Sequence, residues 1–277
     1  MSKITIINDA EQAALVSNNA VTAGKFYLKA EGSTNAGDVV IYNGSAWKRF
    51  ANEGGAFSNA YSVSLDGSNT YMEIPTISEL NAPTNWSFAC WFRYQGTPTT
   101  TSHVIASAGS SSSNRFYIQL ASTSKIRFGN DSSFDDISIS TVSNTTWYHL
   151  ALVQSGTTAE VYLNGSSQGS ATVNSANTGW GTSFKIGRYF TSGFSWNGYL
   201  DEVALFNSAL SASDVAALRD TTGSNPVPAD ISSLNPVAWW RMGDNDNGTG
   251  TTITDQGSGS TDATLVNGPT FSTDIPS

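Results

Sequence analysis

Alternation of apolar and polar residues is the main pattern of the chain. The run Trp86–Phe92 (WSFACWF) places four side chains on one face of a strand, because successive side chains point to opposite faces: Trp86, Phe88, Cys90 and Phe92. The run Trp147–Val153 is apolar on both faces, which is typical of a buried central strand. Many such short runs, separated by turn signals such as Asn164-Gly165, fill residues 56–222. This pattern predicts an all-β sandwich or barrel.

The two flanks differ from this central region. Residues 1–53 predict a small β-rich module, with strand-like runs at Ile4–Ile7, Lys25–Lys29, Asp38–Tyr42 and Ser45–Phe50. We expect a short helix over Ala10–Val16 and a linker at Ala51–Gly55. Residues 223–277 begin with Asn225–Pro228, which interrupts any regular element. The sequence therefore predicts three parts, at 1–53, 56–222 and 223–277.

Two smaller elements can be placed next to these boundaries. Ser211-Ala-Ser-Asp214 has the spacing of a capping box, with Asp instead of the usual Glu, and predicts a short helix that ends at Arg219. In the predicted strand Val237–Met242, Trp239 and Trp240 are adjacent. One of these indoles must therefore enter a core while the other contacts a domain or subunit.

Composition and charge exclude several classes of protein. The 277 residues carry a formal net charge of -9 and only 13% charged residues. A nucleic-acid binder would need a basic stripe, and a protein on anionic lipid would need basic clusters. No apolar run reaches about 18 residues, so we expect no membrane insertion, and the first residues predict no secretory signal. Cys90 is the only cysteine and there are two histidines, so an internal disulfide and a Cys/His metal centre are excluded.

The ordered motifs resemble a known family. The residues that carry the resemblance are Leu65–Gly67, Trp86–Trp91, Trp147–Val153, Val161–Gly165, Ile186–Arg188 and Gly198–Val203, followed by Leu205–Leu218. In order and spacing they are similar to the laminin G-like, concanavalin A-like jelly roll. The resemblance covers most of residues 56–222 and implies two antiparallel sheets packed face to face.

The flanks carry a narrower resemblance. The segments Ala36–Lys48, Val237–Asp244, Thr252–Asp255 and Leu265–Gly268 are similar to structural proteins of tailed phages of marine bacteria, cyanophages included. This resemblance implies a virion protein that is made in the host cytoplasm and displayed on the particle surface. Its partners would be capsid or tail proteins of the same particle, with a homotrimer as the oligomer.

The acidic residues do not form the pattern of a glycoside hydrolase. Such an enzyme needs two carboxylates placed across one glycosidic bond. Asp201 and Glu202 are adjacent, so on a regular strand they would point to opposite faces. We therefore expect no enzymatic activity. His149, within an apolar run, is interpreted as a packed histidine that bonds a neighbouring backbone group, and His103 as a solvated loop residue.

Calcium is the one cofactor that the sequence raises. Its candidate ligands are Asp66, Asp201 and Glu202, because calcium prefers carboxylate and carbonyl oxygens and the resembling family often binds it at the rim of the sandwich. Each has a structural alternative: Asp66-Gly67 as a turn and Asp201 as a buried acceptor that fixes its strand. Asp131, Asp135 and Asp136 are interpreted as a solvated loop, and Gly243–Gly248 lacks the spacing of a calcium loop.

Exposed aromatic rings are the candidate platform for a sugar. The Gly/Ser-rich stretch 177–198 holds Trp180, Tyr189, Phe194 and Trp196, and the alternative is that they close the end of the sandwich or face a partner subunit. The resemblance to phage structural proteins implies a capsid decoration or knob protein, with residues 1–53 as its anchor and an adhesive jelly roll. The alternative is a tail fibre adhesin that recognises host-surface glycans.

Overall fold

The computed structural model describes residues 57–80, 83–111, 114–130, 133–173, 184–191 and 193–277, together with four backbone strands nearer the N-terminus. The chain divides into two compact units, Met1–Ser58 and Asn59–Ser277. Among the described residues, no helix is long and apolar enough to cross a membrane.

The N-terminal unit contains one four-stranded sheet in the described segments. Its order is β1 (Thr5–Ile7), β2 (Phe26–Lys29), β3 (Val39–Tyr42) and β4 (Trp47–Phe50). β1 runs parallel to β2, and the other neighbours are antiparallel. The four predicted strands are confirmed to within two residues. The predicted helix at 10–16 and the linker at 51–55 lie outside the described residues.

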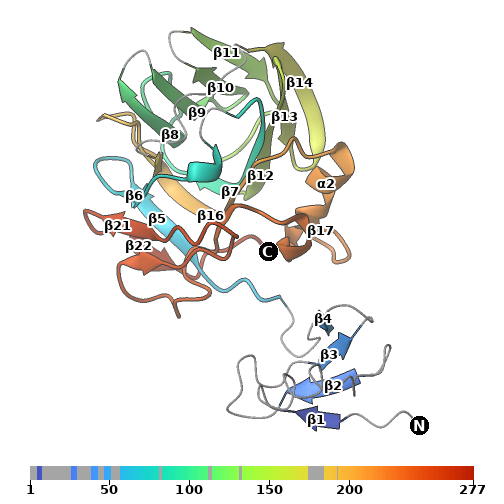
Figure 1. The fold of residues 1–277 in the computed structure, drawn as a ribbon. Coiled ribbons are helices and arrows are strands. Elements are labelled where there is room, and N and C mark those ends of the chain that lie inside the picture. The colour runs from blue at the N-terminus through green and yellow to red at the C-terminus, as the bar shows by residue number, and fades with distance from the viewer. Residues whose placement is uncertain are drawn as a thin grey trace. The chain divides into compact units, whose positions relative to one another are not determined.

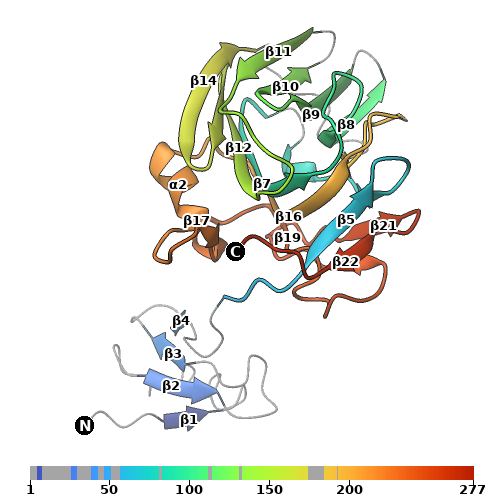
Figure 2. The same ribbon diagram turned by 180° about the vertical axis from the view of Figure 1, so that it is seen from behind.

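The larger unit is a sandwich of two antiparallel sheets (Figure 1, and Figure 2 from behind). Sheet I has the order β11 (Ser133–Ser138), β10 (Lys125–Asn130), β9 (Asn114–Ser122), β8 (Val104–Ser111), β15 (Phe184–Ile186), β6 (Tyr71–Ile74), β21 (Ala263–Val266) and β20 (Thr252–Ile253). Sheet II has the order β14 (Ser166–Thr172), β13 (Thr158–Leu163), β12 (Tyr148–Ser155), β7 (Asn85–Tyr94), β16 (Asn197–Phe206), β5 (Ser62–Asp66) and β22 (Thr270–Ser272), and β19 (Ala238–Trp240) also pairs with β16. The predicted all-β sandwich is confirmed.

The core lies between the sheets and follows the period of two. Trp86, Phe88, Cys90 and Phe92 are fully buried in it, as the alternation in β7 predicts. The Trp86 indole N–H donates to Gln154 Oε1 at 2.9 Å, so the polar atoms of this pair are satisfied inside the core. Burial raises the pKa of the Cys90 thiol, which behaves as a small apolar side chain.

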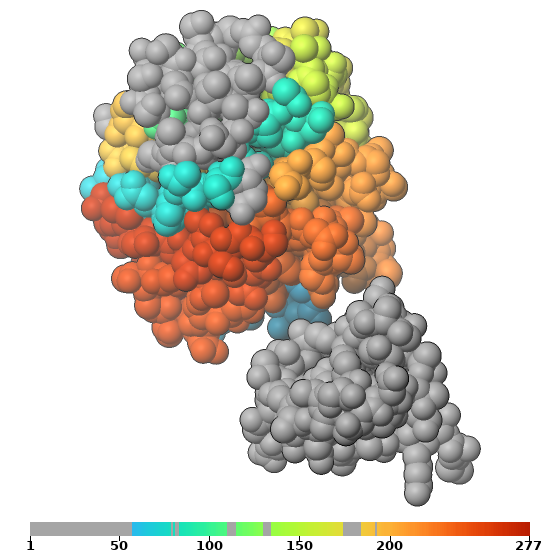
Figure 3. Space-filling view, in the orientation of Figure 1, coloured from blue at the N-terminus to red at the C-terminus, as the bar shows by residue number. Residues whose placement is uncertain are grey.

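The C-terminal residues belong to both sheets. β19 pairs with β16 and β22 with β5 in sheet II, whereas β21 pairs with β6 in sheet I. In the space-filling view this segment, coloured orange to red, covers a broad part of the surface of the larger unit (Figure 3). Trp240 enters the core, and Trp239 faces the other side of sheet II, as their adjacency predicts.

The short helix and a two-stranded ribbon connect this segment to the jelly roll. The helix α2 (Ala212–Ala217) begins with the predicted capping box, in which Ser211 and Asp214 exchange hydrogen bonds. It ends before Arg219, since β17 (Arg219–Asp220) pairs there with β18 (Val227–Pro228). The 3-10 turns η1 (Ser78–Leu80) and η2 (Ser232–Leu234) complete the described elements.

The two histidines are both buried. His149 packs edge-on against Trp91 with 5.4 Å between ring centroids, and its Nδ1 has no hydrogen-bond partner in the structure. The packed position is as predicted, but the backbone bond from the ring is not seen. His103 is 3% exposed, and its ring nitrogens bond Ser102 Oγ and the Gln95 carbonyl oxygen. The prediction of a solvated His103 is wrong, because its ring packs against Trp196.

Candidate functional site

The outer face of sheet I carries an aromatic cavity of about 330 Å³, which we call the Tyr189 pocket. On β9 the side chains of Phe116, Ile118 and Leu120 enter the core, so the alternate ones point outward. The pocket is lined by Thr100, Val104, Arg115, Tyr117, Gln119, Tyr189 and Phe194.

Three aromatic rings form one side of this pocket. Tyr117 and Tyr189 meet edge to face with 5.6 Å between ring centroids, and Tyr189 meets Phe194 at 5.3 Å. Phe194 is 37% exposed. Edge-to-face contacts fix the ring orientations, so the rings are placed before any ligand arrives.

Hydrogen bonds hold the segments that carry these rings. Arg115 Nη1 donates to the Tyr189 hydroxyl at 2.7 Å. Gln119 is buried, and its Nε2 donates to the carbonyl oxygens of Thr99 and Ser102, which fixes the rim next to Thr100. Lys185 Nζ donates to the Phe190 carbonyl oxygen at 3.0 Å and so anchors the loop that presents Tyr189.

The backbone at Phe194 lies in the left-handed region, with a φ of 49°. This conformation costs a residue with a Cβ about 1–2 kcal/mol. Such strain persists only where surrounding contacts impose it, and it concentrates at functional sites. Here the Val104 N–H donates to the Phe194 carbonyl oxygen, and the outcome is a partly exposed ring at the pocket wall.

The electrostatics of the pocket are simple. Burial raises the pKa of Tyr117 and of Tyr189, so both phenols are neutral and able to donate at neutral pH. Arg115 supplies the one charged side chain of the lining, and no carboxylate lines the pocket in the described part of the chain. The site can stack and hydrogen-bond a ligand, but it offers no acid or base for hydrolysis.

The three residues predicted to bind sugar have different outcomes in the structure. Tyr189 lies at the centre of the pocket. Trp180 falls outside the described residues. Trp196 is fully buried against Phe92 and His103, so its ring cannot be a stacking platform and that prediction is wrong. The physical reason is the period of two, which turns Trp196 inward together with Leu200 of the following strand.

A model of a known protein family matches the central part of this chain. Residues 66–216, more than half of the chain, match the model described as the concanavalin A-like lectin/glucanases superfamily. The chain belongs to that superfamily. The jelly-roll resemblance of its motifs is thereby confirmed. A search of curated protein sequences finds no match.

Several solved structures align with this chain at low sequence identity. A provisionally assigned carbohydrate-binding protein from Bacteroides ovatus aligns over 93% of this chain and 72% of its own, with a TM-score of 0.60 and 15% identity. The heptameric SAP-like pentraxin of Limulus polyphemus aligns over 62% and 87%, with a TM-score of 0.47 and 20% identity. Domain 4 of the extracellular arabinanase AbnA from Geobacillus stearothermophilus, solved with arabinotriose, aligns over 67% and 82%, with a TM-score of 0.46 and 18% identity.

The name of the superfamily covers both binding and hydrolysis, so the position of the carboxylates matters. Contrary to the sequence-based expectation, Asp201 and Glu202 do not point to opposite faces of β16. The register with β7 shifts between Asp201 and Ala204, and Glu202 has a φ of 45°. Leu200 and Val203 both enter the core, so this bulge turns the two acids to the outer face together.

These two acids form a buried cluster with groups of the C-terminal segment. Asp201 is fully buried and accepts from Asn59 Nδ2 at 2.8 Å. Glu202 is 6% exposed and accepts from the Trp239 indole and from Arg241. Arg241 also pairs with Asp244 at 2.8 Å. Burial raises the pKa of Asp201 well above its usual value and that of Glu202 to about 7. The cluster therefore lies inside the fold, and its carboxylates are closed to a substrate.

The three predicted calcium ligands are not brought together. Asp66 accepts hydrogen bonds from the backbone of Ser68, Asn69 and Thr70 and from the Thr70 hydroxyl, so it closes its own turn. Asn197 pairs with Asp66, and Asp201 lies four residues further along β16, about 13 Å away. In the described part of the chain, no three His, Cys, Asp or Glu residues are grouped to hold a metal. Asp135 and Asp136 lie on β11, not in a loop, and Asp136 pairs with Arg127.

Sequence analysis missed Tyr117, Arg115 and Gln119. Their signal was present in the run Arg115–Leu120, where these three alternate with Phe116, Ile118 and Leu120. That alternation identifies a strand with one aromatic residue among polar ones on its outer face. The meeting of Tyr117 with Tyr189 depends on the strand order of sheet I, which the alternation alone does not determine.

Proposed function

We propose that the jelly roll binds carbohydrate in the Tyr189 pocket and does not cleave it. The observation that carries this proposal is the convergence of three fixed aromatic rings with one arginine in a cavity of about 330 Å³. A sugar ring presents an apolar face of C–H groups and a rim of hydroxyls. Aromatic faces with a few fixed polar groups are suited to such a ligand.

The position of the acids supports the proposal that the domain does not cleave its ligand. Hydrolysis of a glycosidic bond needs two carboxylates on either side of that bond. In the described part of the chain, the Tyr189 pocket has no carboxylate in its lining. The neighbouring pair Asp201 and Glu202 lies buried on the other sheet. We therefore assign the domain to lectin-like binding within its superfamily.

A glycan array tests the proposal. Wild-type protein is compared with Phe194→Ala, which removes a ring of the pocket, and with Phe134→Ala. Phe134 is the matched control, because it is 53% exposed on β11 and lies outside the pocket. We expect binding by wild type and by Phe134→Ala, and weaker binding by Phe194→Ala. Arrays read with calcium and with a chelator test the calcium expectation. No binding under either condition would refute the carbohydrate proposal.

We further propose that the domain is displayed on a phage particle, as a capsid decoration protein or, alternatively, as a tail fibre adhesin. The resemblance to phage structural proteins supports this setting, and it rests on the segments Ala36–Lys48, Val237–Asp244, Thr252–Asp255 and Leu265–Gly268. Residues 1–53 would attach the domain to capsid or tail proteins, as a homotrimer, and the jelly roll would bind the host-surface glycan.

The copy number per particle distinguishes the two settings and is measured by quantitative mass spectrometry of purified particles. Hundreds of copies are expected for a capsid decoration protein, and a handful of copies for a tail protein. Absence from the particle would refute both.

A further inference from the structure

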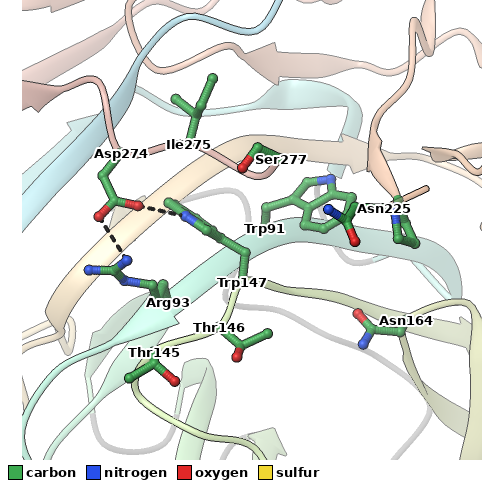
Figure 4. Close-up of a pocket in the computed structure, with 11 residues that line it drawn as sticks. Trp91, Arg93, Thr145, Thr146, Trp147, Asn164, Asn225, Asp274, Ile275 and Ser277 are labelled. Carbon is green, nitrogen blue, oxygen red and sulfur yellow. Dashed lines mark hydrogen bonds and ion pairs between the residues drawn. The ribbon is translucent and has the colours of Figure 1, made fainter. Parts of the chain in front are cut away.

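A second and larger cavity, of about 380 Å³, opens on the outer face of sheet II, and we call it the Trp147 cleft. Five segments that are distant in the sequence meet around it (Figure 4). Arg93 comes from β7 and Trp147 from the segment before β12, while Asn164 belongs to the β13–β14 turn. Asn225 precedes β18, and Asp274 follows β22. A ligand in this cleft would be held by parts of the chain that only folding brings together.

The charged side chains of the cleft neutralise each other. Arg93 Nη1 lies 2.8 Å from Asp274 Oδ2, and these two supply the charges among the described lining side chains. The chain as a whole carries a formal net charge of -9. Because Arg93 is paired with Asp274, the cleft offers no uncompensated positive side chain to an anion, and this favours an uncharged ligand over an anionic one.

The polar side of the cleft is fixed before a ligand binds. The Trp147 indole N–H donates to Asp274 Oδ1 at 2.9 Å, and the Arg93 guanidinium lies 4.9 Å above the ring of Tyr199. The carbonyl oxygen of Asp274 accepts from the Ser62 hydroxyl at 2.6 Å. Figure 4 shows Asp274 joined to both Arg93 and Trp147. Groups held in this way lose little freedom on binding.

The remaining lining groups suit hydroxyls. Asn164 Oδ1 accepts from the His149 backbone N–H at 2.9 Å, which leaves its amide nitrogen to donate. Asn225 and Thr146 are exposed at the cleft, and their amide and hydroxyl groups both donate and accept. The half-buried Trp147 adds an aromatic surface. Donors, acceptors and an indole, with the charged side chains paired to each other, are the complement of a neutral polyhydroxy ring.

We propose that the Trp147 cleft is a second ligand site, which takes one or two units of an uncharged sugar. Its volume lies at the low end of the range of about 300–1,000 Å³ for ligand pockets, which limits the occupant to that size. The Trp147 cleft is formed on sheet II, so ligand binding there does not depend on the Tyr189 pocket of sheet I. With both sites occupied, one domain would bind a branched or repeating glycan at two points and gain avidity.

Indole N–H resonances of the full-length protein test this site. Each tryptophan gives one such resonance, and Trp147→Phe assigns that of Trp147. The probes are glucose, galactose, mannose, N-acetylglucosamine and lactose, with glucuronic acid as the charged counterpart of glucose. We expect a saturable shift of the Trp147 resonance with at least one neutral sugar, its retention in Phe194→Ala, and its loss in Asn225→Ala. Asn245→Ala, at an exposed position outside the cleft, should keep it.

The outcomes separate the two sites. Glucuronic acid should give no saturable shift at Trp147 even where glucose does. Sugar binding that is abolished by Phe194→Ala and leaves the Trp147 resonance unmoved would overturn the second site while the Tyr189 proposal stands. A Trp147 shift that persists in Asn225→Ala would also overturn it. Binding at Trp147 alone would overturn the Tyr189 proposal and leave the cleft as the sugar site.

Discussion

Glu202 and Trp239 lie on the paired strands β16 and β19, and the Trp239 indole N–H donates to the Glu202 carboxylate. The same carboxylate pairs with Arg241 at 3.1 Å. The C-terminal segment is therefore attached to the jelly roll through a buried acid as well as through strand pairing. Because burial raises the pKa of Glu202 to about 7, this attachment depends on pH.

The first prediction concerns the stability of the domain between pH 5 and pH 8. In the unfolded chain Glu202 has its ordinary pKa of 4.5, and burial raises this pKa to about 7 in the folded state. The folded state thus binds the proton more tightly, and its stabilising effect is full below about pH 4.5 and is lost as the pH rises through 7. The raised pKa of Asp201 acts in the same direction. These two acids should lower the melting temperature from pH 5 to pH 8, whereas the lowered pKa values of the buried His103 and His149 act in the opposite direction. The contribution of Glu202 is therefore measured by calorimetry against a variant that lacks its titration.

Glu202→Gln provides the decisive variant for this prediction. It keeps an oxygen acceptor for Trp239 and removes the titration, so between pH 5 and pH 8 its melting temperature should fall less, or rise more, than that of wild type. One pKa unit corresponds to about 1.4 kcal/mol, so the change in slope should be several degrees. Glu73→Gln, at an exposed position of β6, is the control and should keep the wild-type slope. An equal slope in Glu202→Gln and wild type would contradict the prediction.

The second prediction concerns His149. Burial lowers the pKa of its imidazole to about 3, so the stability that this neutral ring contributes is present above about pH 6.5 and is lost as the pH falls toward 3. His149→Phe keeps a ring against Trp91 and removes an Nδ1 that has no partner, and the adjoining cavity of about 10 Å³ gives some room. We expect little change at pH 7.5 and a higher melting temperature than wild type at pH 4.5. A variant that follows the wild-type curve at low pH would contradict this.

The third prediction concerns the close approach of β16 to β7. Gly198 has a φ of 131°, and a Cβ there would collide with the carbonyl oxygen of Arg93. Gly198→Ala should therefore lose more than about 3 kcal/mol of unfolding free energy, because backbone atoms must move. Gly156→Ala is the control, since Gly156 has a φ of 58° and open space around it. That change should cost about 1–2 kcal/mol. Equal losses in urea denaturation would refute the packing argument.

The fourth prediction separates the ring of Phe194 from its backbone. Phe194→Gly and Phe194→Ala both remove the ring, but only glycine adopts the φ of 49° without strain. We expect Phe194→Gly to melt at a higher temperature than Phe194→Ala, while neither binds glycan in the Tyr189 pocket. A lower melting temperature for the glycine variant would show that the surroundings do not impose strain at this position.

The sequence alone predicts those features of the fold that depend on the alternation of side chains within one strand. The inward set of β7 and the division of Trp239 and Trp240 between two faces follow from the period of two. The shared face of Asp201 and Glu202 could not be predicted, because the bulge inserts a residue relative to β7 and the partner strand decides where. Trp196 lay in a Gly/Ser-rich stretch that resembles a loop, although it already continues the inward alternation of β16.

The candidate sites were harder to predict because they depend on topology. Tyr117 meets Tyr189 only because β8 lies between β9 and β15 in sheet I. Arg93 and Asp274 form their ion pair because β22 returns to the edge of sheet II beside β5. No local pattern encodes either contact. The residue types were visible in the sequence, and the fold supplied their grouping.

The most direct test of the central claim is the affinity of one glycan, chosen from the array, for three proteins by isothermal titration calorimetry. Wild type, Phe194→Gly and Phe134→Ala differ by one exposed ring at a time. If the Tyr189 pocket binds the sugar, Phe194→Gly should bind at least about tenfold more weakly, which corresponds to about 1.4 kcal/mol, and Phe134→Ala should match wild type. Equal affinity of Phe194→Gly and wild type would contradict the claim that this pocket holds the carbohydrate.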